Sequence, residues 1–294
     1  MTAISDSVFR FRAVRSIGIP IEDDPDVMVH QQLARLIFLR DFVGVEGCKA
    51  LEFGCGSGLN CEFLMRHCGV KEVVGFDISE DAVDLAREQY AYLTFVRGDA
   101  CDPALDIRRG SWDRVIACEV LEHVPDAQAF LLNIRCHLAP SGIAFVTTPN
   151  RPVFSLGYQP SPVNREHIKE LLFEEFVDVL RPYFSHIEIW GQRFTRTELL
   201  DAWKLDVQNK IVQMAAGTRW QTPVPLRKKL LRLPLVARAY QIPFLQKAWK
   251  ELRWNIKGGF DRKRAIAKRP YSFADFEFSR ELANALWFCA VLKA

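Results

Sequence analysis

The sequence predicts a three-layer α/β fold, in which helices cover both faces of a mostly parallel sheet. Short apolar runs alternate along the chain with longer segments of helical period. One of these runs, Ala50 to Phe53, leads directly into three glycines, Gly54, Gly56 and Gly58. Glycine permits positive φ and a close backbone approach, and such a strand-to-helix turn is where an open α/β sheet binds nucleotide-like ligands.

The same alternation places seven strands and five helices. The expected strands are residues 50–53, 73–77, 93–99, 112–118, 143–148, 186–191 and 285–293. The expected helices are residues 27–43, 59–67, 80–90, 127–138 and 165–180, with Ser79 and Asp126 as N-caps and a turn at 139–142. The sixth and seventh strands are far apart in the sequence, which indicates an insertion between them.

Three parts of the chain are therefore expected. Residues 1–44 form an N-terminal cap segment, residues 45–194 and 272–294 form the α/β domain, and residues 195–271 form a basic helical insertion. Residues 204–269 contain 17 Lys and Arg against three acids, a balance of +14. Because the whole chain carries +3, the rest carries −11, and the basic part is suited to an anionic or amphipathic partner.

Two interpretations of the insertion remain open. Residues 226–239 and 243–257 combine an apolar helical face with Lys and Arg, and Trp249 lies in the second stretch. Such helices suit an anionic membrane surface, and they equally suit a lid that packs on the core with a solvated basic face. Nucleic acid is the less favoured partner, because the aromatic residues follow the apolar helical face instead of being displayed for base stacking.

The composition indicates the cellular compartment of the protein. The eight cysteines form no C-x-x-C pair and no zinc-ligand spacing, which favours reduced thiols in the cytosol. The first 15 residues lack the apolar run of a signal peptide, and no apolar stretch of 18 residues occurs. We expect a cytoplasmic protein, with a peripheral position at a membrane surface if the insertion binds lipid; the oligomeric state does not follow from the sequence.

The glycine spacing distinguishes between ligands. A dinucleotide fingerprint would need a third glycine where Leu59 stands, whereas the chain reads E-x-G-x-G-x-G from Glu52. This pattern resembles motif I of the class I S-adenosylmethionine-dependent methyltransferases. VVGFD at 73–77, LTFVRGD at 93–99 and WDRVIACEVLEH at 112–123 resemble that family's following motifs. The resemblance implies a Rossmann-like sheet of seven strands whose last strand is antiparallel.

The resemblance also implies the cofactor, S-adenosyl-L-methionine, and the residues around it. In the family, an acid at the position of Asp77 binds the ribose hydroxyls and one at the position of Asp99 faces the adenine. The implied cofactor-binding residues are Glu52, Gly54, Gly56, Gly58, Asp77, Ile78, Asp99, Ala100 and Cys118. Cys118 follows a buried strand, and packing is a better interpretation of its thiol than nucleophilic chemistry.

The similarity further implies a hydroxyl acceptor. EVLEH is typical of the family's small-molecule branch, and TTPNR at 147–151 is frequent in its sugar, quinone and RNA-ribose O-methyltransferases. We expect O-methylation of a small or lipid-linked molecule, such as a quinone precursor or a glycan. An RNA-ribose methyltransferase and a non-catalytic scaffold with this fold are the alternatives.

Few residues could help to remove the acceptor's proton. The candidate catalytic residues are Glu119, His123 and His167, and a helix would place Glu119, Glu122 and His123 on one face. E-x-x-E-H together with His167 resembles the metal constellation of small-RNA 3′-terminal ribose methyltransferases. The resemblance implies that Glu119, Glu122, His123 and His167 bind Mg²⁺, Mn²⁺ or Zn²⁺. Alternatively, Glu119 and Glu122 only orient the helix start and the cofactor, with His123 hydrogen-bonded to a loop carbonyl.

Overall fold

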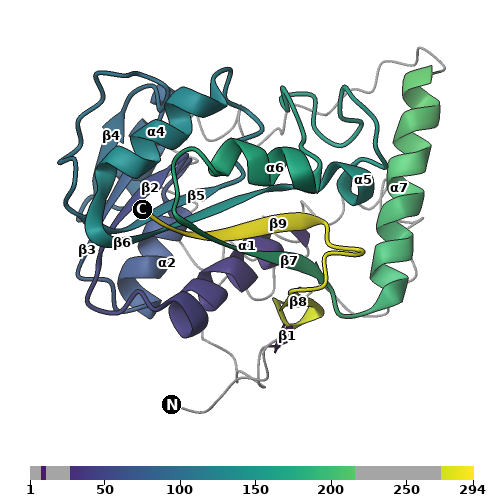
Figure 1. The fold of residues 1–294 in the computed structure, drawn as a ribbon, viewed down its shortest axis with the longest axis horizontal. Coiled ribbons are helices and arrows are strands. Elements are labelled where there is room, and N and C mark those ends of the chain that lie inside the picture. Colours follow the sequence, from purple (N-terminus) through teal and green to yellow (C-terminus); the bar gives the residue numbers. More distant parts are fainter. Residues whose placement is uncertain (1–7, 11–26, 216–272) are drawn as a thin grey trace.

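The computed structural model describes residues 8–10, 27–215 and 273–294 of the chain. Within these residues a single sheet contains all seven expected strands (Figure 1). They are β2 (Lys49–Phe53), β3 (Glu72–Asp77), β4 (Thr94–Arg97), β5 (Trp112–Cys118), β6 (Leu138–Pro149), β7 (His186–Phe194) and β9 (Trp287–Lys293). The strands β2 to β6 pair in parallel, and β9 lies antiparallel between β6 and β7. The predicted fold class is confirmed.

The sheet is wider than the sequence predicted. Two short strands, β1 (Val8–Arg10) and β8 (Phe276–Ser279), extend the edge beside β7. The order in the described chain is β1-β8-β7-β9-β6-β5-β2-β3-β4, which makes nine strands instead of seven. Strands of three and four residues carry too little alternation to be recognised without their neighbours.

Helices cover the two faces of the sheet, and the sheet separates the hydrophobic core into two layers. One layer contains buried side chains of α1 (Val27–Phe38), α2 (Leu59–His67), α3 (Glu80–Gln89) and α7 (Thr197–Ala215). The other contains those of α4 (Ala127–His137) and α6 (Phe173–Leu180). Strand β2 shows the period of two that makes this possible, because Ala50 faces the first layer while Leu51 and Phe53 face the second.

Local sequence signals explain where several of these helices begin. The Ser79 hydroxyl accepts a hydrogen bond from the Ala82 N–H, and the Asp126 carboxylate accepts from the Gln128 and Ala129 N–H groups. Both predicted N-caps are therefore confirmed. A single π-helical turn (Leu39–Val43) follows α1, and the short helix α5 (Arg151–Phe154) follows β6.

One predicted helix begins later than expected, and the helical arrangement considered for residues 119–123 is not formed. The helix expected over 165–180 begins only at Phe173, because the Ile168 and Lys169 N–H groups bond to the Glu122 carbonyl instead of an intrahelical partner. Residues 119–123, which the helical arrangement of the acids required to be a helix, form a turn closed by the His123 N–H and the Val120 carbonyl.

Two other segments differ in detail or cannot be compared. The expected turn at 139–142 is a bulge within β6, since Trp112 pairs with Leu138 and Arg114 with Ile143. The first part of the insertion is helix α7, whereas the amphipathic stretches 226–239 and 243–257 lie outside the described residues. In the part of the chain that is described, no helix is long and apolar enough to cross a membrane.

The close packing of β7 gives a test of the fold. A Cβ added at Gly191 would lie 2.6 Å from the Ala285 Cβ and 3.2 Å from the Leu282 side chain. Overpacking of this kind costs about 1–3 kcal/mol, so Gly191→Ala should lower the free energy of unfolding by that amount in urea denaturation. Adding Ala285→Gly should restore most of the loss. If Gly191→Ala alone is as stable as the wild type, the close contact between Gly191 and Ala285 is contradicted.

Candidate functional site

The glycine loop joins β2 to α2 at the carboxyl end of the strand. Gly54 has φ +71°, and a Cβ there would lie 2.4 Å from the Val120 side chain. Only glycine therefore permits the contact between this loop and the turn that follows β5. Gly56 has φ +52° and no atom within 4 Å of its hypothetical Cβ, so its backbone borders open space. Gly58 ends the loop as the N-cap residue of α2.

Asp77, at the end of β3, fastens this loop to the next one. Its Oδ2 accepts a hydrogen bond from the Gly56 N–H at 2.8 Å, and its Oδ1 accepts from the Ser79 N–H at 2.9 Å. The neighbouring Ile78 side chain is 65% exposed, which is unusual for isoleucine. The geometry thus places a carboxylate and an exposed apolar side chain beside the glycine loop, as a nucleoside-like ligand requires.

The next strand adds polar and partly buried residues at the same edge of the sheet. β4 pairs in parallel with β3, and the chain continues from β4 to Asp99 and Ala100. The Asp99 side chain is exposed, and its Oδ1 accepts from the Cys101 N–H at 2.8 Å. Ala100 is half-buried. The carboxyl ends of β2, β3 and β4 therefore bring together the implied cofactor-binding residues of those strands.

Glu52 has a different position from the exposed acids. It is 1% exposed, and both carboxylate oxygens are occupied by α2: Asn60 donates to Oε1 at 2.6 Å and the Cys61 thiol to Oε2 at 3.0 Å. Burial raises the pKa of Glu52 to about 7. In this arrangement Glu52 braces the start of α2, and with it the glycine loop.

Cys118, the last residue of β5, is buried among apolar side chains. Burial raises the pKa of its thiol well above the ordinary value, which keeps the sulfur protonated and unreactive at neutral pH. The geometry agrees with its interpretation as a packing residue.

Glu119 begins the turn after β5 in a left-handed conformation, with φ +59°. Its N–H bonds to the Thr147 carbonyl, and its Oε1 accepts from the Thr147 hydroxyl at 2.9 Å. The same oxygen lies 3.2 Å from the guanidinium of Arg35, a fully buried residue of α1. The Glu119 carboxylate is therefore held by α1 and β6.

Glu122 is fully buried and only half satisfied. The Thr148 hydroxyl donates to its Oε2 at 3.0 Å, whereas Oε1 is buried without a hydrogen-bond partner in the described structure. Burial, reinforced by the negative charge of Glu119, raises the pKa of Glu122 well above its ordinary value. An unpaired buried carboxylate oxygen is costly, and a cation would remove that cost.

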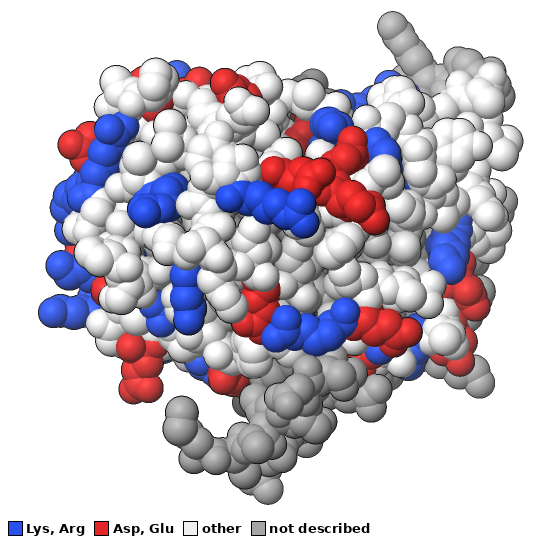
Figure 2. Space-filling view, viewed as in Figure 1, with Lys and Arg blue, Asp and Glu red and all other residues white. Residues whose placement is uncertain are grey.

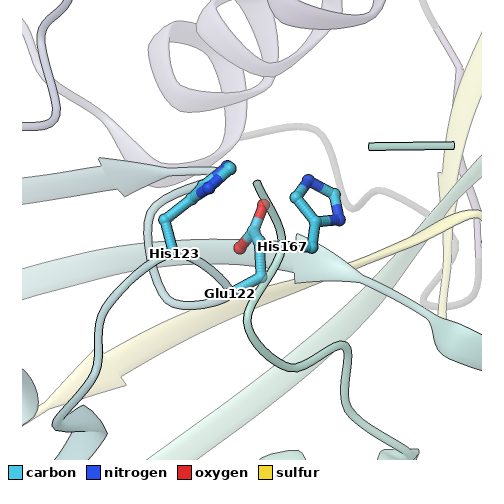
Figure 3. A group of neighbouring side chains, drawn as sticks. All are labelled: Glu122, His123 and His167. Carbon is cyan, nitrogen blue, oxygen red and sulfur yellow. The ribbon is translucent and has the colours of Figure 1, made fainter. Parts of the chain in front are cut away.

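Three of the four predicted metal-ligating residues come together around this carboxylate. Each of Glu122, His123 and His167 offers a ligand atom, and these atoms all lie within 4.8 Å of one another. Figure 3 shows the Glu122 carboxylate between the two imidazole rings. Glu119, the fourth predicted ligand, is not in this group. Burial lowers the pKa of His123, and the charge of His167 lowers it further. The lowered pKa favours the neutral imidazole that a metal needs.

Two further residues at this site were not predicted from the sequence. Glu170 is fully buried and bonds to His167 at 2.7 Å, and Arg35 forms an ion pair with Glu119. A basic residue within the apolar stretch LARLIF of α1 was a signal that could have drawn attention to Arg35. The sequence signal for Glu170 was limited to its spacing of three residues from His167.

Comparisons with known proteins agree with the motifs. A family model described as a methyltransferase domain matches residues 51–146. A probable S-adenosylmethionine-dependent methyltransferase of Mycobacterium tuberculosis is 31% identical over 153 residues, which are 52% of this chain and 51% of that protein. The chain thus spans about half the length of this relative. A ubiquinone biosynthesis O-methyltransferase of Coxiella burnetii is 32% identical over 165 residues, 54% of this chain and 67% of that protein.

Solved structures show the same fold. Phosphoethanolamine N-methyltransferase 2 of Haemonchus contortus, in complex with S-adenosyl-L-methionine, has a TM-score of 0.50 and 18% identity, and the match covers 90% of this chain and 52% of that one. The [4+2]-cyclase SpnF also has a TM-score of 0.50, with 19% identity over 90% of this chain and 80% of that one. Both likenesses are of fold alone.

The buried acid of the glycine-loop strand gives a pH test. The pKa of Glu52 in the folded chain is about 7, above the ordinary 4.5, so folding takes up a proton between these pH values. The stability that Glu52 contributes is present at low pH and falls as the pH rises through 7, by about 3 kcal/mol. Glu52→Gln should remove this loss in urea denaturation between pH 5 and 8. The matched variant Glu88→Gln, at an exposed position of α3, should retain it; an unchanged pH dependence in Glu52→Gln would refute the assignment.

Proposed function

We propose that this chain, which belongs to the class I S-adenosylmethionine-dependent methyltransferases, transfers a methyl group to a hydroxyl oxygen of a small or lipid-linked acceptor. One observation carries the proposal: the glycine loop packs against the turn after β5, which carries two members of the Glu122–His123–His167 cluster. Gly54 packs against Val120, in the turn that also holds Glu122 and His123. A methyl donor on the loop would therefore lie beside groups able to act on an acceptor proton.

The residues around the loop fit S-adenosyl-L-methionine. Gly56 leaves open the space that a side chain would fill, and each Asp77 oxygen retains a lone pair for a ribose hydroxyl. The exposed Ile78 offers an apolar surface to a base. The bound donor supplies a methyl group already activated by its sulfonium. The protein's main task is then to orient donor and acceptor, which can supply about 7–11 kcal/mol.

The Glu122–His123–His167 cluster fits a divalent cation. Glu122 Oε1 is a buried oxygen without a hydrogen-bond partner in the described structure, and two imidazoles lie beside it. One carboxylate and two imidazoles suit Mn²⁺ or Zn²⁺ better than Mg²⁺. Such an ion would bind the acceptor oxygen and lower its pKa, which is what a hydroxyl requires before methyl transfer.

The nature of the acceptor is inferred from a motif of this chain and from one relative. TTPNR at the end of β6 and the ubiquinone biosynthesis relative both favour oxygen methylation of a small molecule. Peripheral binding to an anionic membrane would follow from the basic stretch 204–269, most of which lies outside the described residues. Figure 2 shows basic and acidic residues interspersed on the face that carries α4 and α6, so the described residues of this face offer no basic surface of their own.

Donor binding tests the first part of the proposal. Asp77→Ala removes the acceptor of two backbone N–H groups and of the ribose hydroxyls. We expect the affinity for S-adenosylmethionine in calorimetry to fall about 10- to 100-fold, as charge-assisted hydrogen bonds predict. Asp84→Ala, an exposed acid of α3, should bind as the wild type does. Equal affinity of both variants would contradict the assignment of the loop.

Methyl transfer from labelled donor into a cell extract identifies the acceptor class. Label in the lipid or small-molecule fraction is expected. Label in RNA would favour the second candidate, ribose methylation, which the resemblance of the cluster to RNA 3′-terminal methyltransferases supports. Label in no fraction, with donor binding intact, would favour a non-catalytic role.

The metal part of the proposal has its own test. Glu122→Gln should abolish Mn²⁺ binding measured by electron paramagnetic resonance, because it removes the carboxylate at the centre of the cluster. Glu119→Gln should leave most of the Mn²⁺ affinity, because Glu119 is engaged by Arg35 and Thr147. A wild-type protein that binds no Mn²⁺ or Zn²⁺ would overturn the metal and leave His123 or His167 as a general base.

A further inference from the structure

We infer that the loop of residues 166–170 fixes the tautomers of both histidines, with Glu170 as the positioning residue for His167. The inference rests on the proposed function, since it gives the two imidazoles their task. Glu170 contributes its side chain, and Glu166 contributes its backbone carbonyl, the kind of loop carbonyl expected for His123 in the alternative interpretation of the sequence.

The contact between Glu170 and His167 is short, and both side chains are buried. His167 Nδ1 lies 2.7 Å from Glu170 Oε1, and the side chains are 5% and 0% exposed. An ionised carboxylate can only accept a hydrogen bond, so Nδ1 must carry the proton. Oε2 of Glu170 has no hydrogen-bond partner in the described structure, so the imidazole is the principal partner of this buried carboxylate. A carboxylate that accepts from Nδ1–H leaves the lone pair of a neutral imidazole on Nε2.

The same loop also provides a hydrogen-bond acceptor for Nδ1 of His123. This Nδ1 lies 3.0 Å from the carbonyl oxygen of Glu166. A carbonyl oxygen can only accept, so Nδ1 must carry the proton and the lone pair again lies on Nε2. Two imidazoles from distant parts of the sequence, with ring centroids 4.7 Å apart, thus have the same tautomer imposed by one five-residue loop.

This loop is also fixed relative to the third member of the cluster. The Ile168 and Lys169 N–H groups donate to the Glu122 carbonyl at 2.7 and 3.3 Å. The Gln159 side chain donates to the Glu170 carbonyl at 3.1 Å. These bonds replace the helix expected over 165–172, and they hold the carboxylate and both rings as one unit.

The arrangement has a chemical consequence beyond structure. A hydrogen bond from the distal ring nitrogen to a carboxylate orients a metal-binding imidazole and makes it more basic, and loss of such a partner typically costs 10- to 100-fold in metal affinity. A neutral ring that accepts a proton from a hydroxyl acceptor would benefit equally. Glu170 therefore acts through His167 in either form of the proposed site.

Nitrogen-15 NMR of the metal-free protein at pH 8 tests the tautomers directly. In the wild type, both His123 and His167 should show Nδ1–H and an unprotonated Nε2. Glu170→Leu removes the acceptor and adds no polar atom in its place, so it should shift His167 toward the Nε2–H form. Glu174→Gln is the matched control, since this exposed glutamate of α6 lies outside the loop and the cluster. A wild-type His167 that is mainly Nε2–H would overturn the inference.

Calorimetry with Mn²⁺ gives the second measurement. Affinity should fall about 10- to 100-fold in Glu170→Leu, less in Glu170→Gln, which keeps a neutral acceptor, and not at all in Glu174→Gln. Wild-type affinity in Glu170→Leu, with the protein folded by circular dichroism, would contradict the inference. If the wild type binds no metal but shows the expected tautomers, the metal proposal fails and the positioning role of Glu170 is supported.

Discussion

The buried guanidinium of Arg35 joins the parts of this structure that meet at the site. It projects from α1, bonds to the Gln192 side chain of β7 at 2.7 Å, and pairs with Glu119 at 3.2 Å. It also lies over the Trp287 ring at the start of β9. A buried charge is tolerated only when it is paired and hydrogen-bonded, so these elements must keep their relative positions. The packing of the N-terminal helix and the conformation of the turn after β5 depend on the same cation.

This pairing determines the electrostatics of the cluster. Arg35 balances the charge of Glu119, and the Thr147 hydroxyl occupies the same oxygen. Among the described residues, the side-chain hydrogen-bond partner of Glu122 is the neutral hydroxyl of Thr148, and burial raises the pKa of the Glu122 carboxyl. The protein therefore stabilises one acid and leaves the other in need of a proton or a cation. The two acids of E-x-x-E-H, equivalent in the sequence, have different roles in the fold.

The sequence was sufficient for features that depend on local pattern. Alternation placed the seven main strands, and the capping residues Ser79 and Asp126 marked helix starts. Motif resemblance pointed to Glu122, His123 and His167, whose ligand atoms lie within 4.8 Å of one another in the structure. The failures had non-local causes. The segment 165–172 has helical periodicity, but its N–H groups bond to a carbonyl more than 40 residues earlier in the chain. The roles of Arg35 and Glu170 likewise depend on contacts that no local spacing encodes.

The position of β9 has a consequence for the order in which the chain folds. β9 lies between β6 and β7 and pairs with both along seven residues, although residues 195–286 separate it from β7 in the sequence. Until β9 arrives, β6 and β7 present unpaired edges, and unpaired edges are the surfaces through which sheets aggregate. Closing the sheet requires a long chain loop, which slows folding. The basic stretch, by its place in the sequence, is synthesised while those edges are still open, and its like charges oppose association between partly folded chains.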